Sequence, residues 1–274
     1  MRKCLKLKVP KVPKMNLLPI SYPEFKSFFL ILIRVSVLLF MFPIFSSRLI
    51  PVLAKAGLAF IITIVLFPVI NSKMVEFPDT LWGMGQLIIS EFIIGMILAL
   101  LVQLFFEAIA MMGQLVGFQT GFAIVNILDP QSGMQVSILS NMAYFMAMAL
   151  FLILNGHHIL LSAMKESFEI INVGSLSLNG QIFQKIIDSS ADMFVIAIKI
   201  GAPAIAVLLF TSVAFGLITK LMPQMNIMIV AFPVKIVIGL VFFGISLNVL
   251  LRFMERYLEG LSSLLINAMS CLKV

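Results

Sequence analysis

Several charged side chains lie in or near long runs of apolar residues, and they are the residues of this sequence best placed to do chemistry. A charge in a hydrocarbon-like environment is costly, so it serves a proton or ion pathway or is neutralised by a partner. Glu107 is close enough to the end of its run to reach a polar surface, as is Lys55. The others could form a relay, neutralise one another or line a subunit interface, and they are Arg34, Glu91, Lys199 and Lys235.

Two adjacent histidines, His157 and His158, follow the fourth apolar run in the sequence NGHH. Neighbouring side chains on a helix point about 100° apart, so this pair lacks the i, i+4 spacing of a helical metal site. The sequence also lacks the HExxH, GxSxG, Walker and GxGxxG motifs of common catalytic and phosphate-binding sites. We interpret the histidines as helix-end caps or subunit contacts, and we expect no catalytic residue, metal or cofactor.

The composition is that of a membrane protein. Of the 274 residues, 61% are hydrophobic and 11% are charged, and the mean hydropathy is +1.14, whereas soluble domains contain about 45–50% apolar residues. Apolar runs recur from Phe28 almost to the C-terminus, which leaves no soluble stretch long enough for a separate catalytic domain. Cys4 and Cys271 lie at opposite ends, without the spacing of a metal site or a disulfide framework. We expect one domain.

The positive charge is concentrated at the start of the chain. The net charge is +7, and six cations precede the first acidic residue, Glu24. Such a patch can attract nucleic acid, but beside a hydrophobic chain it favours an anionic membrane surface. We therefore expect membrane lipids as partners and no nucleic acid. The six cations are Arg2, Lys3, Lys6, Lys8, Lys11 and Lys14.

Each long apolar run predicts a spanning or buried helix, because isolated strands cannot satisfy their backbone groups in lipid. Breaks rich in proline, glycine and asparagine separate the runs. An N-terminus on the inside puts thirteen cations in the cytoplasm, seven in the tail through Lys26 and six further along, against three outside. The six runs are 28–45, 51–70, 87–112, 136–154, 194–221 and 227–251.

Two stretches repeat apolar residues at helical spacing beside polar ones. The first runs from Ile182 to Phe194, and the second runs from Met254 to Met269. Either apolar face could pack on the protein itself. For the second stretch we favour contact with a partner helix, because it extends past the last apolar run and starts in a charged segment, 252–259.

Three segments carry a resemblance to a known family. GFQTGFAIVNILDPQSG (117–133) combines glycine and aromatic residues with an Asp-Pro turn, and it contains no lysine or arginine. LFLILNGHHILLSAMKESF (150–168) places Asn-Gly-His after an apolar run and ends in Ser-Phe, and LMPQMNIMIVAFPVKIVIGL (221–240) has Met-Asn and Phe-Pro before a lysine and a glycine. Over about residues 15–274 the chain resembles the FliR/SctT family of type III secretion export-gate proteins. In overall pattern it is more similar to the flagellar branch.

The resemblance implies an all-α integral membrane protein with about six long apolar helices arranged as bent hairpins, FliP-like in its N-terminal part and FliQ-like in its C-terminal part. One such subunit would join several copies of FliP and FliQ in a gate in the bacterial inner membrane, at the flagellar basal body. FlhB and FlhA would be further partners, and exported flagellar proteins would be transient substrates. Residues 1–14 depart from the family pattern, so we divide the chain into a basic extension, 1–14, and one helical membrane domain, 15–274.

The resemblance also implies roles for particular residues. In the family, the loop after the third long helix contributes a plug to the closed gate; glycine, phenylalanine and Asp-Pro suit a loop that folds closely and excludes water. Carried onto this chain, the plug residues are Gly117, Phe118, Gln119, Gly121, Phe122, Ile124, Asp129 and Pro130. The candidates for subunit interfaces are Glu91, Asn155, Gly156, His157, Lys199, Pro223, Met225, Asn226, Phe232, Pro233, Lys235 and Gly239.

Two alternatives stay open at this point. Gly113, Gly117 and Gly121 recur every four residues, which is also the pattern of a close-packed helix face, and packing can coexist with a plug. For the whole chain, the alternative to a non-enzymatic gate subunit is a stand-alone secondary transporter that uses the buried charges.

Overall fold

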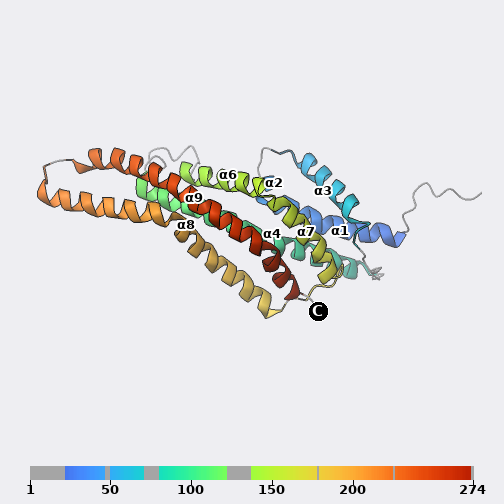
Figure 1. The fold of residues 1–274 in the computed structure, drawn as a ribbon. Helices are drawn as coiled ribbons and strands as arrows, with labels where there is room; N and C mark the ends of the chain where they lie inside the picture. Colours follow the sequence, from blue (N-terminus) through green and yellow to red (C-terminus); the bar gives the residue numbers. More distant parts are fainter. Residues whose placement is uncertain are drawn as a thin grey trace, which may run out of the picture.

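The computed structural model describes residues 22–46, 50–70, 80–121, 137–177, 179–224 and 226–272, and α-helices make up most of these ranges. Three helices are much longer than the rest: α4 (Leu81–Thr120), α8 (Gly180–Leu221) and α9 (Ile227–Ser270). They build an elongated molecule in which α8 and α9 form a long hairpin (Figure 1). The shorter helices are α1 (Tyr22–Met41), α2 (Pro43–Ser46), α3 (Val52–Leu66), α6 (Ile138–Ile153) and α7 (Gly156–Ile170).

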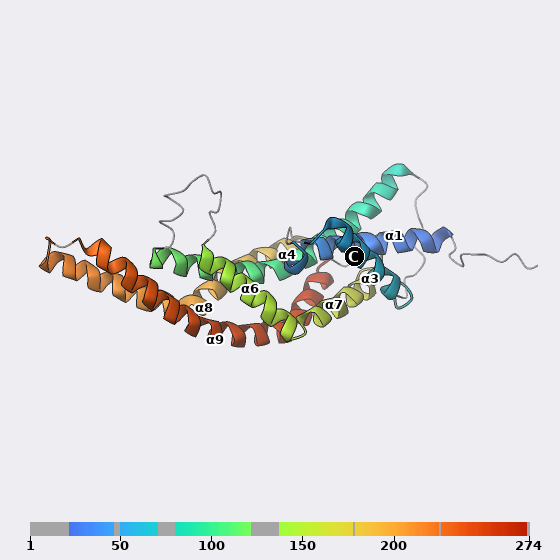
Figure 2. The same cartoon turned by 90° about the horizontal axis from the view of Figure 1, so that it is seen from above.

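Helix α4 is the central element of the fold. It packs against α1, α6, α8 and α9, and two views at right angles show it running lengthwise among them (Figures 1 and 2). Its sequence explains this position, because apolar residues continue round the helix and leave little polar surface. A helix of that kind is buried, and Ile94, Phe106, Ile109 and Met112 have no exposed surface.

Local sequence sets both ends of α4. Thr80 lies in extended backbone before the helix, and its hydroxyl oxygen accepts a hydrogen bond from the Gly83 amide at 3.3 Å. Gly121 ends the helix in the left-handed region (φ 90°), where its amide donates to the Phe118 carbonyl oxygen. A side chain would be strained in that conformation, so the glycine determines where the helix stops.

Small residues let α4 approach α6 at backbone distance. A Cβ atom on Gly113 would lie 2.6 Å from the Cα atom of Ser140. One turn later, a Cβ atom on Gly117 would overlap the side chain of Ser137. The Ser140 hydroxyl donates to the Ala110 carbonyl oxygen at 2.7 Å, which ties the two helices together. The close-packed glycine face is therefore confirmed at this end of α4.

The chain turns by 72° between α6 and α7. Asn155 occupies the left-handed region (φ 57°), which asparagine adopts more readily than most residues. Gly156 follows, and a Cβ atom there would lie 2.5 Å from the Phe151 ring. The Asn-Gly pair therefore forms a corner that the fold of the chain itself requires.

Helix α9 is core at one end and surface at the other. It packs against α4 and α7, and the apolar stripe in its second half, including Met254, Leu261 and Met269, is buried. Our prediction that this stripe contacts a partner helix was wrong, because the chain covers the stripe itself. Toward the tip of the hairpin, large apolar side chains such as Ile229 and Val237 are exposed.

Three helices, α4, α8 and α9, are long and apolar enough to cross a membrane, and the bent pair of α6 and α7 makes a fourth if it counts as one span. The all-α class therefore fits the described residues. Six spanning helices are not confirmed, because α3 is short for a span and α1 contains three charged residues. The division into FliP-like and FliQ-like parts stays a prediction, and residues 1–14 lie outside the described residues.

Gly113→Ala should destabilise the protein, because the added methyl group would meet the backbone of α6. Overpacking of this kind costs about 1–3 kcal/mol. Gly216→Ala is the matched control, since Gly216 lies inside α8 and nothing lies within 4 Å of the place where its Cβ would be. That change should leave stability unchanged or raise it by up to about 1 kcal/mol. Thermal unfolding in detergent measures the effect of both changes. If Gly113→Ala unfolded at the same temperature as Gly216→Ala, the close approach of α4 and α6 would be contradicted.

Candidate functional site

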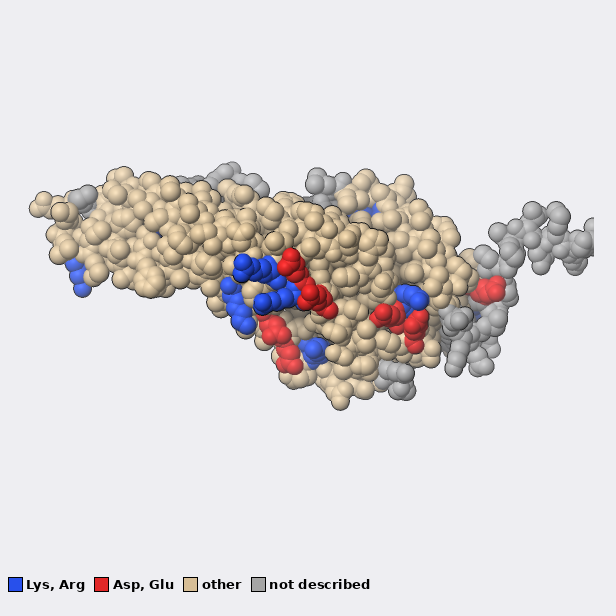
Figure 3. Space-filling model, viewed as in Figure 1, with Lys and Arg blue, Asp and Glu red and all other residues tan. Residues whose placement is uncertain are grey.

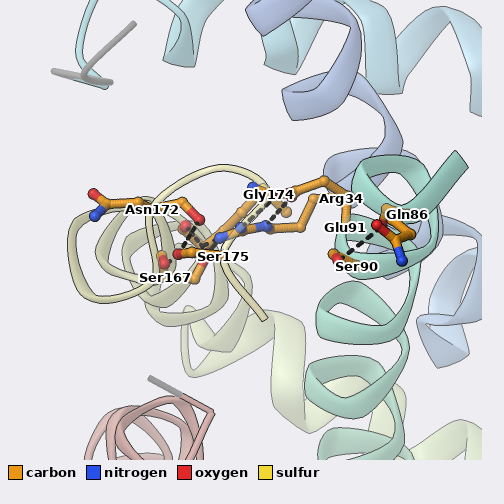
Figure 4. Close-up of polar contacts among 9 residues, drawn as sticks. Arg34, Gln86, Ser90, Glu91, Ser167, Asn172, Gly174 and Ser175 are labelled. Atoms are coloured by element: carbon orange, nitrogen blue, oxygen red, sulfur yellow. Dashed lines mark hydrogen bonds and ion pairs between the residues drawn. The ribbon is translucent and has the colours of Figure 1, made fainter. Parts of the chain in front are cut away.

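An ion pair with no exposed surface joins α1 to α4. The Arg34 guanidinium donates from Nε to one Glu91 carboxylate oxygen at 2.6 Å and from Nη2 to the other at 3.1 Å (Figure 4). Both side chains are 0% exposed. Two parallel hydrogen bonds make this the strong form of an arginine–carboxylate pair. For Arg34 and Glu91, the interpretation that the buried charges neutralise one another is confirmed.

Helix α7 and the turn after it complete what we call the Arg34–Glu91 cluster. Arg34 Nη1 donates to the Ser167 carbonyl oxygen at 3.0 Å, and its guanidinium carbon lies 4.1 Å from the centre of the Phe168 ring. The Gly174 amide donates to the Glu91 carboxylate at 2.7 Å. Gly174 has φ 81°, a conformation that glycine adopts without strain. Four segments of the chain therefore meet at one charge pair (Figure 4).

The Arg34–Glu91 cluster is suited to holding helices in place. Arginine stays protonated in proteins, and both Glu91 carboxylate oxygens already accept hydrogen bonds. A proton relay needs a neighbouring group that accepts a proton and passes it onward, whereas the described partners of the Glu91 carboxylate are a guanidinium and a backbone amide, which only donate hydrogen bonds. The geometry therefore favours an internal structural role for Glu91 over a contact between subunits.

The other charges singled out in the sequence lie apart from this cluster. Lys199 and Glu107 are exposed, Lys235 is half-buried, and none of the three forms an ion pair with a described residue. In Figure 3 the visible charges gather near the middle of the molecule and toward the end opposite the hairpin tip, and the outer part of the hairpin is uncharged apart from blue atoms at its tip. The described part of the chain therefore does not assemble these charges into a relay.

The start of the predicted plug stretch lies against α9. The residues from Gly117 to Thr120 form the last turn of α4. A Cβ atom on Gly121 would lie 2.6 Å from the Phe232 ring, and the Thr120 side chain fills the space that a Gly239 side chain would occupy. Phe232 and Gly239, predicted as interface residues, therefore make close contacts within this chain.

Of the remaining plug residues, two lie in the last turn of α4 and the others lie outside the described residues. Phe118 is 58% exposed. The side-chain oxygen of Gln119 is buried and has no hydrogen-bond partner among the described residues. The plug residues outside the described ranges are Phe122, Ile124, Asp129 and Pro130.

The other predicted interface residues lie at the α6–α7 corner or near the hairpin tip. Asn155 is exposed, and His157 is half-buried with its ring centre 4.3 Å from that of His158. Pro223 and Asn226 are exposed in the turn between α8 and α9, and Pro233 is exposed inside α9. Met225 lies outside the described residues. No group of three potential metal ligands occurs in the part of the chain that the structure describes.

Known proteins are similar to this chain over most of its length. Residues 25–261 match the sequence model of the bacterial export proteins, family 1. The chain belongs to this family. The matched range contains all three segments that carry the resemblance to FliR and its virulence counterpart.

Relatives of the same export family support the flagellar branch. The chain is 30% identical to flagellar biosynthetic protein FliR of Bacillus subtilis (strain 168), over 82% of this chain and 88% of the relative. It is 28% identical to FliR of Escherichia coli (strain K12), over 87% of this chain and 91% of the relative. For FliR of Aquifex aeolicus (strain VF5) the identity is 28%, over 82% and 87%. The resemblance to FliR is thereby confirmed.

Sequence reasoning alone does not find every member of the Arg34–Glu91 cluster. Ser167 and Phe168 belong to a segment that marks the family, but the sequence contains no sign of their contact with Arg34. The contact of Gly174 with Glu91 is not predicted from the sequence. The one local signal is its place in the turn NVGSLSLNG between two helices, where glycine often takes a positive φ.

Removing one partner of the buried pair should cost more than removing both. Glu91→Leu leaves an unpaired guanidinium and should lower the free energy of unfolding by about 3–5 kcal/mol. The double variant Arg34→Met/Glu91→Leu should recover most of that loss, because it leaves no buried charge.

The exposed pair of Lys165 and Glu169, 3.5 Å apart, supplies the control for this experiment. Glu169→Ala should change the free energy of unfolding by less than about 0.5 kcal/mol. Thermal unfolding in one detergent compares all the variants with the unmodified chain. A double variant as unstable as Glu91→Leu alone would contradict the assignment.

Proposed function

We propose that the chain is a non-enzymatic subunit of the flagellar type III protein export gate, in the bacterial inner membrane at the flagellar basal body. The observation that carries the proposal is the match to the export family over residues 25–261. The similarity to FliR proteins, which extends over most of their length, agrees with it. Three helices apolar and long enough to span a bilayer support a membrane-embedded component.

The partners in this proposal are FliP and FliQ in the gate, FlhB and FlhA beside it, and exported flagellar proteins in transit. The surface of the α8–α9 hairpin supports a subunit that assembles with others. Phe210 is 70% exposed and Leu221 is 81% exposed, and apolar surface of this extent needs lipid or protein cover.

The proposed subunit contacts are the exposed or half-buried members of the predicted set. Residues whose contacts lie inside the chain, namely Glu91, Gly156, Phe232 and Gly239, instead shape the surface that carries those contacts. The proposed contact residues are Asn155, His157, Lys199, Pro223, Asn226, Pro233 and Lys235, and to them we add Met225, which lies outside the described residues.

The finer proposal is that the stretch 117–133 contributes a plug to the closed gate. Gly117 and Gly121 pack tightly on α6 and α9, which holds the point where the stretch leaves α4. The exposed ring of Phe118 is available to seal an aperture, as rings and isoleucine do in hydrophobic constrictions. Asp129 and Pro130 would supply the turn.

The stand-alone transporter is the weaker alternative. Its carriers would be the buried charges, and the most buried of them, Arg34 and Glu91, already satisfy each other within the chain. Lys199 is exposed and Lys235 is half-buried. Residues that contact another subunit have the same exposure, so these two lysines do not favour a transport site.

Co-expression with FliP and FliQ should give a stable complex that contains one copy of this chain, and native mass spectrometry of the purified complex measures the stoichiometry. The chain alone, reconstituted in vesicles, should move no solute. The transporter alternative requires the opposite result, with activity of the chain alone that Lys199→Gln or Lys235→Gln abolishes. A homodimer that ignores FliP and FliQ would count against the gate.

Replacing Phe118 and Phe122 together by alanine should make the assembled gate leak small ions, because two water-excluding rings are lost. Conductance of complexes in planar bilayers measures the leak. Phe145→Ala is the control, since it removes another highly exposed ring, on α6 and outside the plug stretch. If the plug variant conducts no more than this control, the plug assignment fails while the subunit assignment stands.

A further inference from the structure

An apolar groove lies between the N-terminal turns of α1 and α4. Its volume is about 350 Å³. The two helix ends diverge there (Figure 2), and side chains of both helices line the groove. Four large apolar residues of the lining remain 37–59% exposed. They are Phe25, Phe29, Met84 and Ile88, and the other lining residues are Lys26, Leu30 and Leu87.

The lining suits an alkyl chain better than a polar ligand. Apart from Lys26, the lining residues are phenylalanine, leucine, isoleucine and methionine. Phenylalanine offers a large apolar face, and the unbranched thioether of methionine adapts its shape to an irregular guest. Since α4, which forms one wall of the groove, is long and apolar enough to cross a membrane, lipid acyl chains are the hydrocarbon most available to the groove.

Lys26 adds a charge to the groove. It is half-buried, so its methylene groups can line the apolar wall while its ammonium group reaches toward the polar surface. Six more cations precede it at residues 2–14. The distribution of cations along the chain favours a cytoplasmic position for this end, and basic pockets between membrane helices on that side bind anionic headgroups.

We propose that the groove binds one anionic phospholipid, with an acyl chain against Phe29, Met84 and Ile88 and the phosphate beside Lys26. Such a lipid would fill the gap between the two diverging helices. It would also act close to the Arg34–Glu91 cluster, which joins the same two helices about one to two turns further along. The proposal depends neither on the plug nor on the partners of the gate.

Native mass spectrometry tests the proposal on the full chain, delipidated in detergent and then mixed with phosphatidylglycerol or phosphatidylcholine. The unmodified chain should retain one phosphatidylglycerol at concentrations where it retains no phosphatidylcholine. Lys26→Gln should weaken retention of phosphatidylglycerol about fivefold, which corresponds to the loss of about 1 kcal/mol of attraction to the headgroup. Ile88→Phe should weaken retention by narrowing the groove.

Two matched variants control for charge and bulk. Lys220→Gln removes an exposed cation from the last turn of α8, and Ile89→Phe adds the same bulk at the neighbouring residue, which is not among the described residues that line the groove. Both should retain phosphatidylglycerol as the unmodified chain does. Unfolding temperatures are recorded for every variant, and Lys26→Gln keeps the test decisive if Ile88→Phe folds poorly.

Two results would overturn the proposal. One is equal retention of phosphatidylglycerol and phosphatidylcholine by the unmodified chain. The other is equal retention of phosphatidylglycerol by Lys26→Gln and Lys220→Gln. Neither result bears on the number of copies of this chain in a complex with FliP and FliQ, so the lipid site and the proposed function fail independently.

Discussion

Arg34 is a permanent positive charge without exposed surface in a chain that is 61% hydrophobic. Removing an ion from water costs several kcal/mol, and a partner offsets that cost only when the geometry is good and the remaining polar groups are also paired. Here α1 supplies the cation, α4 the carboxylate, α7 a carbonyl oxygen and the turn after α7 an amide. The positions of these four segments are therefore tied together, since moving any one of them would leave a buried polar group unpaired.

Helix α4 connects this polar cluster to a junction held by different forces. From Glu91 to Gly113 the helix spans about 33 Å at 1.5 Å per residue. At Gly113 and beyond, the contacts with α6 and α9 are close approaches that leave no space for a further methyl group. Interiors packed in this way transmit displacement instead of absorbing it. Because α4 is held by the ion pair at Glu91 and by close packing from Gly113 onward, the position of Gly121 at its C-terminal end is determined by both contacts.

Sequence predicts the parts of this structure that depend on neighbouring residues. Hydropathy identifies the apolar helices, although the run 194–221 continues as helix back to Gly180 because no glycine or proline interrupts the polar half. Contacts between residues far apart in the sequence cannot be predicted from local patterns. No feature of the sequence around Gly174 indicates its hydrogen bond to Glu91, 83 positions away. The stripe 254–269 shows a further limit. An amphipathic face has the same sequence pattern whether it packs on its own chain or on a partner.

Burial within the chain differs among the three long helices and bears on how the protein is covered. In the most apolar 18-residue stretch of α4, 44% is buried inside the chain, whereas the shares buried in the corresponding stretches of α8 and α9 are 28% and 22%. Lipid provides no hydrophobic force between helices, so association in a bilayer relies on close backbone approach and on polar contacts. Gly216 on α8 and Gly244 on α9 have open space where a side chain would be. The hairpin surface therefore leaves room for the kind of close helix contact that Gly113 already makes inside the chain, as the proposed assembly with other subunits would require.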